Sequence, residues 1–328
     1  MINNLHLKPQ FTEDSLLIQK DRYLWDNWIV YDGVEKQYLR YSLSAPRSVG
    51  DNSMRHKHAR LRVFSSPDGK TWTDRGLLVN DGLTWSGQTI QNKDGSFTLL
   101  VTKAKHLDNQ DVHQKFAIAH SKDGVNFGEA QTLLDPWSPA WKGNLEKAGY
   151  HLGPADGGIT SWRDPHLFED VLYFGARKKK ANGDIVLAVG RLEYPNADLS
   201  ATPRILEPLE LPIEKSITEL EVPNMKQLED GRYLLSVNMS DRASPESKTM
   251  DINTWVRFYV SESKEGPWTP AKAPQLDEMG NLYGASDRVY GFNLLQGLEP
   301  GEIKGAGFLR SGNENDHALT PIVSIDIE

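Results

Sequence analysis

Short stretches of alternating apolar and polar residues recur along most of this chain of 328 residues. Stretches such as Arg232 to Asn238 and Trp255 to Ser261 are rich in β-branched and aromatic side chains, which favours β-strands. Turn pairs such as Asp94-Gly95 and Asn182-Gly183 separate several of these stretches, and convincing amphipathic helices are absent. The pattern therefore predicts an all-β fold. Further strands are expected at Gln37 to Leu43, Arg60 to Ser65, Ser96 to Thr102, Phe116 to Ser121, Val171 to Ala176 and Ile185 to Leu192.

A weak internal repeat indicates how these strands are grouped. The segment Ser66 to Trp72 recurs as Ser121 to Phe127 and, in blurred form, as Ser261 to Trp268. Each copy predicts a strand, a Gly-containing turn and an aromatic residue that folds back onto the sheet. A recurrence after about 55 residues fits a four-stranded propeller blade. We predict a single domain over residues 1–328, a five-bladed β-propeller closed by a strand in Leu319 to Ile327. The length alone leaves six smaller blades open.

Composition and charge limit the cellular compartments and the binding partners that we expect for this protein. The formal net charge is −8, which disfavours a general attraction to nucleic acid or to an anionic membrane. There is no cysteine, so thiolate chemistry and disulfides are excluded. The first residues show no basic region followed by an apolar stretch, so we expect a cytoplasmic protein. The nine Trp and eleven Tyr suit a protein that packs rings against a small carbohydrate, and no cofactor is expected.

The first acidic motif places Asp26 between Trp25 and Trp28. If it lies on an innermost blade strand, its carboxylate faces the mouth of the central channel on a rigid backbone. The alternative is an Asp in a turn between two core tryptophans.

The second acidic motif runs from Trp162 to His166. On an extended strand, Arg163 and Asp164 would point to opposite sides, so Asp164 would not simply pair with its neighbour. Pro165 biases Asp164 to an extended conformation. The alternative is an Asp-Pro turn that closes a loop, and His166 is best interpreted as structural.

The third acidic motif contains Glu219 and Glu221, which would share one face of a strand. Two neighbouring carboxylates raise the pKa of at least one of them, and a Glu that stays protonated near neutral pH is what a general acid requires. The alternative is a solvent-facing strand edge with two ordinary glutamates.

Two further motifs are weaker. Trp85 and Ser86 precede a glycine in a predicted bend and could offer a ring and a hydroxyl to a sugar, although a core tryptophan is an equally good interpretation. His56 and His58 would share a strand face as a metal pair, but no third ligand is evident, and a solvated charged face fits better. We therefore predict no metal site.

Taken in order, these motifs resemble glycoside hydrolase family 68, the levansucrases and β-fructofuranosidases that act on sucrose. The resemblance implies a five-bladed β-propeller and a retaining mechanism with Asp26 as nucleophile, Asp164 as the group that binds fructosyl hydroxyls and stabilises the transition state, and Glu221 as acid/base. It also implies that the sugar subsites are lined by Trp25, Trp85, Ser86, Arg163 and Glu219.

The chain departs from that family at Val222, where the family commonly has an arginine directly after the acid/base glutamate. Arg242 is a loose candidate for a replacement. The chain is also shorter than most levansucrases, which suggests trimmed loops and favours hydrolysis or short-range transfer over polymer synthesis. Two alternatives stay open: an inverting furanosidase of the arabinanase and xylosidase type, and a carbohydrate-binding propeller without turnover.

Overall fold

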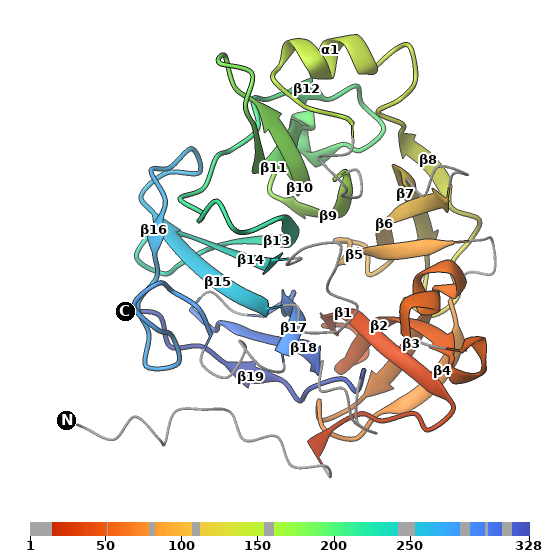
Figure 1. The fold of residues 1–328 in the computed structure, drawn as a ribbon. Coiled ribbons are helices and arrows are strands. Elements are labelled where there is room, and N and C mark those ends of the chain that lie inside the picture. The colour runs from red at the N-terminus through yellow and green to blue at the C-terminus, as the bar shows by residue number, and fades with distance from the viewer. Residues whose placement is uncertain are drawn as a thin grey trace.

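The strands of the protein form five small antiparallel sheets arranged in a ring (Figure 1). The computed structural model describes residues 15–50, 52–78, 83–106, 112–153, 161–241, 253–282, 289–298, 301–309 and 317–328. Blade 1 contains β1 (Arg22–Asp32), β2 (Gln37–Pro46), β3 (Arg60–Ser66) and β4 (Thr73–Leu77), and blade 2 contains β5 (Thr84–Gln91), β6 (Phe97–His106), β7 (Val112–Ser121) and β8 (Gln131–Leu134). Blade 3 contains β9 (Arg163–Phe168), β10 (Val171–Lys179), β11 (Ile185–Glu193) and β12 (Arg204–Ile205).

Blade 4 contains β13 (Glu219–Gln227), β14 (Tyr233–Asp241), β15 (Asn253–Ser261) and β16 (Thr269–Pro270), and blade 5 contains β17 (Val289–Leu294), β18 (Lys304–Leu309) and β19 (Val323–Ser324). The first strand of each blade lies nearest the axis of the ring, where it contacts the first strands of both neighbouring blades (Figure 1). The five-bladed β-propeller predicted from the sequence is confirmed. The short helices are η3 (Arg47–Val49), η4 (Asn52–His58), α1 (Lys142–Lys147) and η5 (Pro195–Ala197), and no helix in the described part of the chain is long and apolar enough to span a membrane.

The internal repeat marks the turn after the third strand of a blade. In blade 1 the Ser66 hydroxyl accepts a hydrogen bond from the Gly69 amide at 2.9 Å, and Asp68 accepts from the two following amides. The turn after Ser121 in blade 2 repeats these bonds with its own serine and aspartate. Trp72 then packs back onto the core, as the pattern predicts.

Side-chain amides connect neighbouring blades in place of a backbone ladder. Gln88 accepts from the Leu167 amide at 2.7 Å and donates to the Leu167 carbonyl at 3.2 Å, which joins blade 2 to blade 3. Asn238 makes the same pair of bonds with Phe292, at 2.8 and 2.9 Å, between blades 4 and 5. Each amide thus satisfies both backbone polar groups of a residue in the neighbouring sheet.

The ring closes between blade 5 and blade 1. Leu17 and Leu319 exchange backbone hydrogen bonds of 3.0 and 3.1 Å, so residues from both ends of the described chain take part. Arg40 on β2 is fully buried, and its guanidinium donates to the carbonyls of Thr320 and Gly307 beside blade 5 and to the side chain of Asn27. The closing segment predicted at Leu319 to Ile327 does pair with this blade, through Leu319 and β19.

Candidate active site

A β-bulge interrupts each of the five innermost strands. The register shifts at Asp26 in β1, at Ser86 in β5 and just after Glu221 in β13, and comparable shifts occur where β9 and β17 pair with their neighbours. A bulge inserts an unpaired residue and re-aims its side chain. Four of the residues at these bulges have a positive φ angle: Asp26 at 38°, Asp164 at 60°, Val222 at 51° and Gly291 at 59°.

Arg163 brings three carboxylates together. Its Nη2 atom donates to Glu219 Oε2 and, at 2.7 Å, to Glu221 Oε1, while its Nε atom lies 3.8 Å from Asp164 Oδ2. The guanidinium and the Glu219 carboxylate are both nearly fully buried, whereas the Glu221 side chain keeps 19% of its surface exposed. The prediction that the two glutamates share one face is confirmed.

The expectation that Arg163 and Asp164 point to opposite sides is wrong, and so is the expectation that Pro165 holds Asp164 extended. Asp164 adopts the left-handed conformation at the bulge of β9, which breaks the alternation of an ordinary strand. Its Oδ2 accepts from the Val222 amide at 3.1 Å, and its own amide donates to Thr102 at 2.9 Å. Contacts to two other blades therefore fix this carboxylate.

The surroundings of Asp164 favour its protonated form. Burial is the main cause, and the nearby charges of Glu221 and Glu219 act in the same direction. Arg163 and the Val222 amide oppose them, and the pKa of Asp164 rises to about 7.

Asp26 joins the same cluster from blade 1. Burial raises the pKa of Asp26 well above its ordinary value, and the charges of Glu221 and Asp164 add to the increase, while Arg55 and Arg163 lower it. Although it lies deep in the protein, Asp26 retains some accessible surface, as a group that faces a channel would. The structure thus brings Asp26, Asp164 and Glu221 together, as their predicted roles require.

Tyr290 is a site residue that the sequence analysis missed. Its hydroxyl donates to Glu221 Oε2 at 2.6 Å, on the carboxylate oxygen that Arg163 does not bind. The next residue, Gly291, leaves room for Asp26, because a Cβ atom there would lie 2.7 Å from Asp26 Oδ1. No local motif distinguishes this tyrosine. It lies in the fifth blade, far along the chain from the acidic motifs, so no sequence pattern connects it to them.

The predicted sugar-binding residues Trp25, Trp85 and Ser86 line the same region. Trp25 Nε1 and Ser86 Oγ are buried, and neither has a hydrogen-bond partner among the residues that the structure describes. The ring of His56 contacts the rings of Trp25 and Trp85 edge-on, at centroid distances of 5.8 and 5.9 Å. The sequence analysis missed His56 and its neighbour Arg55 as site residues.

The structure corrects the expected position of His56 and His58 and does not test the expected role of Arg242. His56 and His58 lie on helix η4 and not on a strand, so the shared strand face is wrong. In the described part of the chain, no three His, Cys, Asp or Glu side chains are grouped as metal ligands. His166 is buried near the Met225 carbonyl, which lies 3.2 Å from Nε2, and burial lowers its pKa to about 4, in keeping with a structural role. Arg242 lies outside the described residues.

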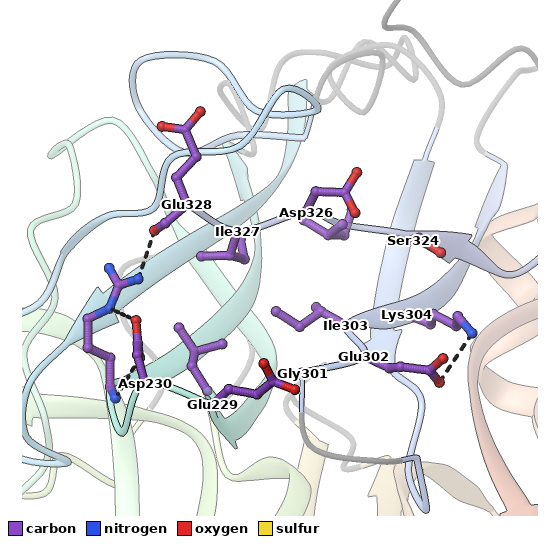
Figure 2. Close-up of a pocket in the computed structure, with 13 residues that line it drawn as sticks. Glu229, Asp230, Gly301, Glu302, Ile303, Lys304, Ser324, Asp326, Ile327 and Glu328 are labelled. Atoms are coloured by element: carbon purple, nitrogen blue, oxygen red, sulfur yellow. Dashed lines mark hydrogen bonds and ion pairs between the residues drawn. The ribbon is translucent and has the colours of Figure 1, made fainter.

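A separate groove of about 560 Å³ lies between blades 4 and 5 (Figure 2). It is lined by the turn Leu228 to Arg232 and by residues 301–304 and 324–328. This turn follows the end of β13, whereas Glu219 and Glu221 begin that strand, so the groove opens at the opposite end of the blade from the carboxylates. Arg232 and Lys304 pair there with Asp230 and Glu302, and the groove contains none of the predicted site residues.

Fold and site together define a five-bladed propeller with four carboxylates grouped around one buried arginine at its channel. Solved structures of the same fold include an inulosucrase from Halalkalicoccus jeotgali bound to kestose, with a TM-score of 0.69 and 22% identity over 98% of this chain and 90% of that chain. Bacillus subtilis levansucrase has a TM-score of 0.66 and 16% identity over 99% of this chain and 89% of that chain. The similarity to levansucrases that the motifs predicted is confirmed.

Sequence comparison finds a relative over part of the chain. An extracellular sucrase of Zymomonas mobilis subsp. mobilis is 26% identical over 174 residues, which cover 49% of this chain and 41% of the sucrase. The chain therefore matches less than half the length of this curated relative. No family model matches the chain.

Proposed function

We propose that the protein is a retaining glycoside hydrolase of the family 68 type that acts on sucrose or a related β-fructofuranoside. The observation that carries this proposal is the convergence of Asp26, Asp164 and Glu221 on one arginine-centred cluster, with the carboxylates of Asp26 and Asp164 placed at bulges of two innermost strands. The similar proteins are a sucrase, an inulosucrase and a levansucrase, which supports sucrose as the donor.

In the first step, a carboxylate oxygen of Asp26 attacks the anomeric carbon of the fructosyl unit, and the bond from that carbon to the glycosidic oxygen breaks. Glu221 gives its proton to the departing oxygen, which leaves as a glucose hydroxyl. In the second step, Glu221 takes a proton from water while that water attacks the same carbon and releases Asp26. A sugar hydroxyl in place of water gives transfer instead of hydrolysis.

The cluster can hold the proton that this mechanism requires. Arg163 lies against Asp164, Glu219 and Glu221, and burial raises the pKa values of both Asp164 and Asp26. The raised pKa of Asp164, about 7, lets the cluster hold a proton near Glu221 at neutral pH. Asp164 has one carboxylate oxygen bonded to Val222 and is suited to bind fructosyl hydroxyls with the other.

Turnover of sucrose tests the proposal. The purified protein should release glucose and fructose, and Asp26→Asn or Glu221→Gln should lower the rate by several orders of magnitude, because each variant keeps the shape but removes a group that the transition state needs. Asp94→Asn, in the exposed β5–β6 hairpin turn, is the matched control and should retain the wild-type rate. A tenth or more of wild-type activity in either site variant would contradict that residue's role.

The anomer formed first decides between retention and inversion. A retaining enzyme places its two carboxyl groups about 5–5.5 Å apart, and an inverting enzyme leaves roughly 6.5–9.5 Å for a water molecule. We expect proton NMR to show retention at the fructosyl carbon. Inversion would favour the arabinanase-type alternative, and tight sugar binding without any turnover would favour the carbohydrate-binding propeller.

A further inference from the structure

Helix η4 inserts between β2 and β3 of blade 1 and reaches the candidate site with two consecutive residues. The guanidinium carbon of Arg55 lies 5.4 Å from the centre of the Trp25 ring, and His56 packs edge-on against Trp25 and Trp85. Arg55 is only 9% exposed, so its charge is largely removed from water. Helix η4 therefore places a largely buried positive charge beside the residue that precedes Asp26.

On balance, the surroundings of Asp26 disfavour its ionised form. Glu221 and Asp164 repel a negative charge on Asp26, and burial also disfavours it. Arg163 is occupied by three other carboxylates, and its effect on Asp26 is smaller than that of Arg55. Among the described residues, His56 and His317 also contact the Trp25 ring, and Tyr290 contacts Glu221.

A nucleophile must be ionised when the substrate arrives, and this cluster opposes ionisation. We propose that Arg55 on helix η4 is a positioning residue that supplies compensating positive charge for Asp26 and thereby favours the ionised form of the nucleophile in the ligand-free protein. This inference rests on the role of Asp26 in the proposed function. It gives a place in the reaction to Arg55, which directly precedes His56 in the stretch that the sequence analysis interpreted as a solvated charged face.

The pH dependence of sucrose turnover tests this role. Arg55→Met removes the charge but keeps a side chain of similar length over Trp25, so the acidic limb of kcat/KM should move up by about one pH unit. Arg55→Lys retains the charge and should leave the limb near its wild-type position. Arg47→Met is the matched control, because Arg47 covers the Tyr23 ring in the same insertion at 4.5 Å, and its limb should not move. An unmoved limb in Arg55→Met, or an equal shift in Arg55→Lys, would overturn the proposal.

A second measurement does not depend on activity. Unfolding equilibria of the wild type, Arg55→Met, Asp26→Asn and the double variant form a mutant cycle, with all four proteins unfolded in urea. If Arg55 interacts with an ionised Asp26, the two substitutions should be non-additive by a factor of about five or more in the unfolding constant at pH 8, and closer to additive at pH 4.5. Additivity at pH 8 would refute the inference. Coupling without sucrose turnover would leave the inference standing and refute the proposed substrate.

Discussion

Replacing Gly291 with alanine should displace the proposed nucleophile. A Cβ atom at this position would lie 2.7 Å from Asp26 Oδ1, whereas ordinary contact begins near 3.4 Å, so the carboxylate must move by about 0.7 Å. Displacements approaching 1 Å at a reacting group cost about a hundredfold in rate. We therefore expect kcat/KM for sucrose to fall about a hundredfold in Gly291→Ala.

The close contact with Asp26 and the positive φ at Gly291 would both affect the Gly291→Ala variant, so a control must separate the two effects. Gly291 has a φ of +59°, and an alanine in that region costs about 1–2 kcal/mol of stability. Gly183→Ala is the matched control, because Gly183 has a φ of +92° but no atom within 4 Å of the added Cβ. Both variants should lose stability in urea unfolding, with a larger loss for Gly291→Ala because the Phe308 ring must also move. Wild-type kcat/KM in both variants, within a factor of three, would show that Asp26 is not the attacking group in this position.

Three further predictions concern the charges of the cluster. Arg163→Met removes a cation from beside buried carboxylates and should lower the free energy of unfolding by about 3–5 kcal/mol at pH 8 and by less at pH 5. Arg204→Met, at an exposed ion pair, is the control and should change the free energy of unfolding little. Equal losses in the two variants would contradict the buried cluster. Because the pKa of Asp164 rises from 3.8 to about 7 on folding, the folded state binds more protons than the unfolded state between these values, and stability should fall as pH rises through that window. Asp164→Asn should flatten this dependence in unfolding experiments at pH 4.5 and 7.5, and an unchanged slope would refute the assignment. Glu219→Gln leaves the Arg163 charge to Glu221, so the alkaline limb of turnover should move to lower pH, and a limb that stays or rises would refute the shared cation.

The fold was accessible from the sequence because its signals are local. The Ser-x-Asp-Gly turns after Ser66 and Ser121 fix the end of a third strand through their own side chains, and alternation along the strands marks the rest of each blade. The spacing of these turns indicated the size of one blade, the chain length favoured five blades while leaving six open, and the structure decides for five.

The detailed site was less accessible because its geometry depends on irregular backbone. Asp164 takes a left-handed φ without being a glycine, so alternation placed its side chain on the wrong face. Tyr290 reaches Glu221 from the neighbouring blade, and Arg55 acts on Asp26 from helix η4 of the same blade, so no local sequence pattern links either pair. The acidic residues themselves stood out because Trp, Arg and Pro neighbours distinguish them from solvated charges.

The contact of Arg40 with the Thr320 carbonyl spans 280 positions of the chain, and this has a consequence for synthesis. Each blade consists of hairpins between neighbouring segments, so blades can form one after another as the chain leaves the ribosome at about 5–20 residues per second. The channel, however, is complete only after residues 317–320 dock on blade 1, since Leu24 and Arg40 bond to that segment. A nascent chain that stops earlier exposes the unpaired edge of blade 5 and the apolar flank of blade 1, which makes the unfinished ring a target for chaperones.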